Sequence, residues 1–111
     1  MTAADDLRAT ARYIEEVGFA RGTAEVLGKG TAVCVLGGMA RVCDLEPNLV
    51  AYNLASGTLR YQNLTLALRD YLRAQNIPRV SVPVWNDITV KDERELTVTL
   101  EKAAAWIEER G

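Results

Sequence analysis

Apolar side chains near the start of the chain recur at intervals of three and four residues, which is the spacing of one helix face. Those positions are Leu7, Ala11, Ile14 and Val17. We expect Gly18 to close this helix, since glycine accepts the left-handed backbone that follows a last helical turn. Asp5 or Asp6 is the expected cap at its start, where a carboxylate meets unpaired N–H groups and the positive end of the helix dipole.

The same spacing is strongest at the other end of the chain, at Leu96, Leu100, Ala103 and Ile107. Asp92 followed by Glu95 resembles a capping box, in which each residue satisfies an N–H group of the other. The sequence therefore predicts a helix from about Glu93 to Arg110.

Two further helices are predicted in the middle of the chain. The first starts near Pro47, since proline is tolerated in a first helical turn, and ends at Gly57. The second has Thr58 or Asn63 as its cap and ends at Asn76 before Pro78. Its apolar stripe consists of Tyr61, Leu64, Leu68, Tyr71 and Leu72.

The stretch from Phe19 to Gly30 is rich in glycine and reads as a loop, and its GKGT ending lacks the spacing of a phosphate-binding loop. The segment that follows, Ala32–Leu36, is apolar and fits either a buried helix or a buried strand. We favour a helix from about Ala32 to Val42 capped by Thr31, and the strand remains open. Gly37 and Gly38 would each cost roughly 1 kcal/mol inside that helix unless they allow another segment to approach closely.

Alternating valines in VSVPVW predict a short strand from Val80 to Val84, with Pro83 restricting it to an edge or a bulge. Its possible partners are Ala24–Leu27 and Ala32–Leu36. The predicted fold is thus mainly α: a single domain over residues 1–111, with about four helices and a short β strand or hairpin. An α+β fold is the alternative.

Composition fits a soluble globular domain, with 49% hydrophobic and 25% charged residues among 111. The net charge is −2 and basic residues are scattered, so we expect at most weak binding to nucleic acid. A nucleic-acid face would require five arginines to cluster: Arg8, Arg12, Arg60, Arg69 and Arg73. The chain has neither a basic signal-peptide start nor an apolar run long enough to span a membrane, so we expect a cytoplasmic protein.

The two cysteines, Cys34 and Cys43, lie among small apolar residues, and the chain has no histidine. Their spacing fits no zinc pattern. We therefore expect buried, reduced thiols that are dispensable for function, with no metal and no cofactor.

Trp85, Asn86 and Asp87 form the one concentrated polar motif, just before the last helix. In one interpretation Asp87 is a general base, Asn86 positions a substrate and Cys34 is a nucleophile. Thiol catalysis generally needs an activating base, however, and no histidine exists here. In the favoured interpretation Trp85 is buried and Asp87 bonds backbone N–H groups in the turn toward the last helix.

The chain resembles a family of small uncharacterised proteins of actinobacteria and their phages. The segments that carry this resemblance are Phe19 with Gly22, VCVLGGM with Cys34 and Gly37, and Trp85-Asn86-Asp87. Two positions depart from the family pattern, since Phe19 stands where Trp is commoner and Arg21 where Gln is commoner. The resemblance implies a mostly helical domain and carries no assigned activity.

Two functions follow as hypotheses. The first is a small non-enzymatic binding or regulatory module, of phage or actinobacterial origin, that acts through protein–protein contacts; it rests on a complete core, near-neutral charge and the missing catalytic set. The second is a small enzyme or ligand-binding protein centred on Trp85, Asn86, Asp87 and Cys34. A homo-oligomer is compatible with both.

Overall fold

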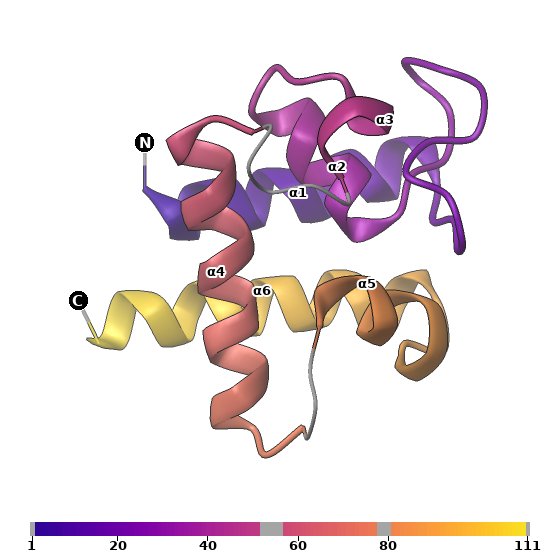
Figure 1. Ribbon diagram of the computed structural model, residues 1–111. Coiled ribbons are helices and arrows are strands. Elements are labelled where there is room, and N and C mark those ends of the chain that lie inside the picture. The colour runs from indigo at the N-terminus through magenta and orange to yellow at the C-terminus, as the bar shows by residue number, and fades with distance from the viewer. Residues whose placement is uncertain (1, 52–56, 78–80, 111) are drawn as a thin grey trace.

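Helices from the two ends of the sequence lie side by side and run in opposite directions (Figure 1). They are α1 (Ala3–Val17) and α6 (Glu93–Arg110). The computed structural model describes residues 2–51, 57–77 and 81–110. The other elements in chain order are α2 (Val35–Val42), α3 (Pro47–Val50), α4 (Leu59–Ala74), α5 (Val82–Val84) and the π-helical turn η2 (Trp85–Thr89). The predicted mainly helical fold is confirmed.

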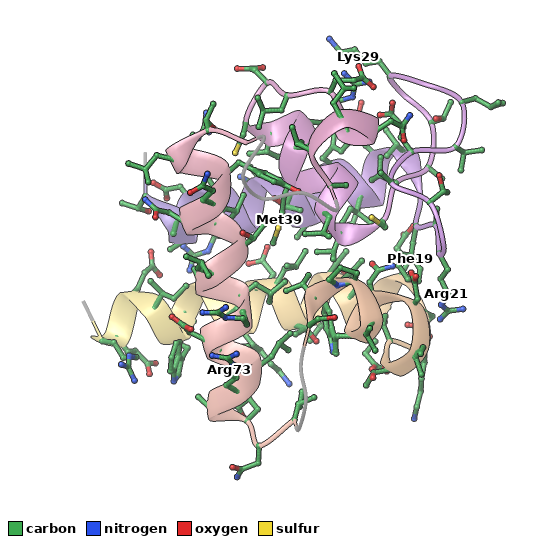
Figure 2. All side chains as sticks on the ribbon, viewed as in Figure 1. Phe19, Arg21, Lys29, Met39 and Arg73 are labelled. Atoms are coloured by element: carbon green, nitrogen blue, oxygen red, sulfur yellow. The ribbon has the colours of Figure 1, made fainter. Side chains whose placement is uncertain are left out.

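The core forms where α1, α2, α4 and α6 meet. In Figure 1, α4 crosses steeply in front of α6, and α2 packs above α1. The stripes that the sequence predicted for α1, α4 and α6 supply most of the fully buried side chains. Met39 of α2 fills the space between these helices (Figure 2) and is fully buried. Burial of aliphatic side chains at roughly 25 cal/mol per Å² is therefore the main stabilising contribution.

Three helix ends follow the predicted chemistry. Gly18 closes α1 with a φ of 102°, and the hydroxyl of Thr58 accepts a hydrogen bond from the Tyr61 N–H at 3.3 Å. Helix α6 has the predicted bounds, and its Asp92 carboxylate accepts from the Glu95 N–H at 2.8 Å.

The predicted N-cap residue of α1 was wrong, although a carboxylate does meet a free N–H group at the start of the helix. The cap is Thr2, whose hydroxyl accepts from the Asp5 N–H at 3.1 Å, while the Asp5 carboxylate accepts from the Thr2 N–H. Asp6 is instead buried, and Arg60 of α4 donates two hydrogen bonds to it, at 2.9 and 2.7 Å. A reciprocal threonine box satisfies two N–H groups at once, which moves the start of the helix upstream.

The predicted strand from Val80 to Val84 was also wrong where the structure describes it. Val82–Val84 forms the single turn α5, capped by the Ser81 hydroxyl, which accepts from the Val84 N–H at 3.4 Å. A strand would place Val82 and Val84 on the same face, whereas Val82 is buried and Val84 is half exposed. Pro83 fits this turn because a first helical turn needs no donor there. Val80 lies outside the described residues.

The segment from Ala32 to Leu36 divides between the two predicted alternatives. Helix α2 begins only at Val35, and its cap is Cys34 rather than Thr31. Val33 is extended and pairs with Phe19 in a parallel bridge and with Glu25 in an antiparallel bridge. Both predictions were therefore partly right.

Gly37 explains why a glycine stands inside α2. A Cβ on Gly37 would lie 1.9 Å from the carbonyl oxygen of Ala24, so only glycine lets this loop residue approach the helix. A Cβ on Gly38 would lie 3.2 Å from Ile14 of α1, which is a milder crowding. The close approach that would compensate for the low helix propensity is thus present.

Candidate functional site

Asn86 lies in η2 and is almost completely buried. Its Oδ1 accepts a hydrogen bond from the Val35 N–H at 2.9 Å, at the first residue of α2. Its Nδ2 donates to the Ala20 carbonyl at 3.3 Å and to Asp87 Oδ1 at 2.9 Å. One side chain therefore bonds to both ends of the loop between α1 and α2.

Asp87 bonds to the same loop. Its Oδ1 accepts from the Gly22 N–H at 3.0 Å in addition to the Asn86 amide. The favoured interpretation was right that Asp87 would bond a backbone N–H group. It was wrong about the location, since this group is 65 residues away and not in the turn before α6. The loop reaches across to η2 (Figure 1), so a tertiary partner replaces the local one.

Trp85 is 3% exposed, so its predicted burial is confirmed. Its carbonyl accepts a hydrogen bond from the Val90 N–H at 3.0 Å, which closes the π-helical turn. A π-helical turn holds one residue more than an α-helical turn between bonded groups. With the Trp85 ring anchored in the core, Asn86 is buried against α2, and Asp87 lies half-buried beside Gly22.

We call the contact of Trp85, Asn86 and Asp87 with the loop between α1 and α2 the joint. Cys34 lies next to this joint, since Asn86 binds the backbone of the following residue. The Cys34 side chain is 1% exposed, and its Sγ accepts from the Gly37 N–H at 3.4 Å as the cap of α2. Cys43, at the other end of α2, is also buried, and burial raises the pKa of its thiol. Neither cysteine forms a disulfide, so the expectation of buried thiols is confirmed.

Arg21 is a member of this joint that the sequence did not identify. Its guanidinium donates to the carbonyls of Val90 and Lys91, at 2.7 Å in the second case, and lies 5.1 Å from the centre of the Phe19 ring. Figure 2 shows Arg21 and Phe19 where the loop meets the segment between η2 and α6. No local pattern marks an arginine that binds carbonyls 70 residues away.

A second set of bonds fixes the loop to α2. Glu25 is 2% exposed, and the guanidinium of Arg41 donates to both of its carboxylate oxygens, at 2.8 and 2.7 Å. Buried carboxylates require such partners because an unpaired charge in the interior is costly. The Cys34 N–H also donates to the Ala24 carbonyl at 3.1 Å.

The tip of this loop is ordered by its own hydrogen bonds and exposes apolar side chains. The Thr31 hydroxyl donates to the Gly28 carbonyl at 2.6 Å and accepts from the Leu27 N–H at 2.9 Å. Val26 is 49% exposed and Leu27 is 86% exposed. Figure 2 shows Lys29 at the outer end of the loop, away from the joint.

The described part of the chain contains no group of three or more acidic, cysteine or histidine side chains that could hold a metal ion. Within residues 2–51, 57–77 and 81–110, every helix is too short or too polar to cross a membrane.

These features define a small helical domain in which the polar motif before the last helix bonds to the backbone of the loop between α1 and α2. The chain belongs to a family of unknown function, DUF6197, whose model matches residues 1–110. Neither the curated proteins nor the solved structures include a significant match to it.

Proposed function

We propose that the protein is a non-enzymatic binding module that acts through protein–protein contacts, and that the loop between α1 and α2 makes those contacts. One observation carries this proposal: the polar groups of the candidate site are used to fix that loop, and the loop turns Leu27 outward. The Asn86 amide and Asp87 Oδ1 together bond to three backbone groups of residues 20–35.

The rigidity of the loop supports this role. An exposed leucine alone is normal on a protein surface. A leucine on a loop whose conformation is already fixed loses little conformational entropy on binding, and preorganisation of this kind raises affinity. Leu27 lies on such a loop, with Thr31 holding the tip and Gly37 admitting the Ala24 backbone against α2.

The alternative function, a small enzyme or ligand-binding protein centred on Trp85, Asn86, Asp87 and Cys34, has less support. A general base needs an oxygen aimed at a substrate, and Oδ1 of Asp87 already accepts two hydrogen bonds. The Cys34 thiol caps α2 and is 1% exposed, so a substrate has little access to it.

Nucleic acid is not the proposed partner, and we expect at most weak binding to it. Three of the five arginines that would form a nucleic-acid face pair with carboxylates: Arg8 with Glu108, Arg60 with Asp6, and Arg69 with Asp70. Neutralised arginines contribute little to the counterion release that drives such binding.

The source and compartment belong to the same proposal. The resemblance of the sequence motifs supports an actinobacterial or actinophage origin. Two buried cysteines without a disulfide fit a reducing cytoplasm, since disulfides persist mainly in oxidising compartments.

The test is affinity capture from an actinobacterial lysate with a photo-crosslinking amino acid in place of the neighbouring Val26, which is 49% exposed. We expect one stoichiometric partner, which Leu27→Ser abolishes. Leu59→Ser is the matched control, because Leu59 is 71% exposed on α4, away from the loop. A partner that binds Leu27→Ser as well as the unaltered protein, or the recovery of only uncrosslinked protein, would overturn the proposal.

A further inference from the structure

A groove of about 510 Å³ lies between α4 and α6, on elements that take no part in the joint described above. Its lining residues are Ala67, Asp70, Arg73, Ala74, Trp106, Ile107 and Arg110. Arginine and small or apolar side chains therefore share one recess. Figure 2 shows Arg73 on the half of α4 that lies beyond its crossing with α6.

The groove has a net positive charge in a protein whose total charge is −2. Neither Arg73 nor Arg110 forms an ion pair with another residue that the structure describes. The one acid in the lining, Asp70, lies 3.9 Å from Arg69, which offsets its charge. Two guanidinium groups thus remain available to an oxyanion.

The apolar part of the groove is held in place. The guanidinium of Arg110 lies 4.4 Å from the centre of the Trp106 ring, and Tyr71 meets the same ring edge-on at 5.7 Å. These contacts orient both the ring and the cation before any ligand arrives. Ala67 and Ala74 leave the recess open because their side chains are small.

We propose that this groove binds a small organic anion, whose carboxylate or phosphate group meets Arg73 and Arg110 and whose apolar body lies against Trp106 and Ile107. Guanidinium groups match both oxyanions because their N–H groups form a planar fork. A pocket that combines apolar walls with a few convergent polar groups is the usual form of a small-molecule site. This site goes beyond the proposed function. Its test does not depend on whether the loop between α1 and α2 binds a partner.

The test uses the two tryptophans of the chain as internal reporters. Indole N–H signals are followed by two-dimensional NMR while phenyl phosphate or benzoate is added to the whole protein. We expect the Trp106 signal to move in a saturable way and the signal of the buried Trp85 to stay. Phenyl phosphate carries a phosphate group and benzoate a carboxylate, so the two probes distinguish the two oxyanions. Inorganic phosphate supplies the oxyanion without an apolar body, and phenol supplies the aromatic body without the oxyanion. Each separate part should bind at least about tenfold more weakly than the joined probe.

Arg73 and Arg110 both lie in the last turns of their helices, where a cation stabilises the helix end even without a ligand. Variants distinguish that structural role from ligand binding. Arg73→Gln should weaken binding of the anionic probe roughly ten- to a hundredfold, the usual effect of losing a charged hydrogen bond. Arg12→Gln is the matched control, because Arg12 is exposed on α1 and outside the groove. Melting temperatures are measured for both variants. No saturable movement of the Trp106 signal, or equal affinity of Arg73→Gln and Arg12→Gln, would overturn the proposal even if Arg73→Gln melts earlier.

Discussion

The side chain of Asn86 accepts a hydrogen bond from the backbone N–H of Val35, although 51 residues separate the two. Val35 is the first residue of α2, and its N–H has no partner within the helix. A buried amide from another part of the chain thus satisfies one end of α2. The same amide binds Ala20, so the position of the loop and the start of α2 depend on one side chain.

Removal of the Asn86 side chain should therefore be strongly destabilising. Asn86→Ala leaves the Val35 N–H and the Ala20 carbonyl without partners in a buried site, and we expect a loss of about 2–4 kcal/mol in the free energy of unfolding. Urea denaturation followed by circular dichroism measures this loss. Asn63→Ala, at an exposed position of α4, is the control and should change the free energy by less than about 1 kcal/mol.

Substitutions of Asp87 distinguish a structural role of this residue from a catalytic one. Asp87→Ala loses the bond to the Gly22 N–H and should cost about 1–3 kcal/mol. Asp87→Asn keeps an oxygen that can accept this bond, so its melting temperature and partner affinity should stay close to those of the unaltered protein. A general base would not survive this change, because an amide does not take a proton. A folded Asp87→Asn protein that has lost its activity would contradict the structural role.

Gly37 and Gly38 are neighbours in α2 but should respond differently to alanine. In Gly37→Ala the new Cβ meets the Ala24 backbone oxygen at 1.9 Å, so the loop has to move. We expect a loss of stability of about 3 kcal/mol or more, at the upper end of overpacking costs. Gly38→Ala meets only the Ile14 and Thr10 side chains, at 3.2–3.3 Å, and should cost less. Equal melting temperatures for the two variants would show that the loop does not lie against Gly37.

Both thiols should react slowly in the native protein. Cys34 is 1% and Cys43 is 7% exposed, and burial raises the pKa of the Cys43 thiol, which keeps it protonated and weakly nucleophilic. A chromogenic disulfide reagent should therefore modify both cysteines quickly in urea and only slowly without it. Cys34→Ala should cost about 0.5–2 kcal/mol as a lost cap and leave partner binding intact. Rapid stoichiometric labelling of Cys34 in native protein would refute the buried-thiol interpretation.

The ion pair between α1 and α6 should make stability depend on pH. Arg8 donates two hydrogen bonds to Glu108, at 2.8 and 2.6 Å, and these lower the pKa of the Glu108 carboxyl. Because the pKa is lower in the folded state, the contribution is present above the unfolded-state pKa of roughly 4.3 and is lost as the pH falls through the folded-state value.

Glu108→Gln removes this contribution, so the fall in melting temperature on acidification from neutral pH should become smaller. The neighbouring Glu109→Gln, at an exposed position without an ion pair to another described residue, should leave that fall unchanged. The same acid sensitivity in both variants would exclude the proposed linkage.

The helices could be predicted because their signals are local. The stripe from Leu96 to Ile107, the glycine at position 18 and the hydroxyl of Thr58 each act within a few residues of themselves. The strand at Val82–Val84 was mispredicted because alternation over so few residues also fits a helical turn, and only the Ser81 cap and tertiary burial decide between them.

The joint could be predicted only in part. The burial of Trp85 and a backbone partner for Asp87 follow from residue type, since tryptophan is apolar and aspartate accepts hydrogen bonds. That the partner is Gly22, that Asn86 binds Val35 and that Arg21 binds Val90 depend on how distant segments meet in space. No spacing within the sequence encodes those pairs.

The packing of α1 on α6 also has a consequence for synthesis on the ribosome. Helix α1 emerges before α6, yet α6 is the largest part of the surface that buries its apolar stripe. Residues 86–91 supply several of the side-chain and backbone groups that bond to the loop after α1. Until those residues leave the exit tunnel, Leu7, Ala11 and Ile14 lack most of their final neighbours. The nascent chain therefore presents an incompletely covered apolar helix until α6 emerges, and we expect it to associate with ribosome-bound chaperones until translation of α6 is complete.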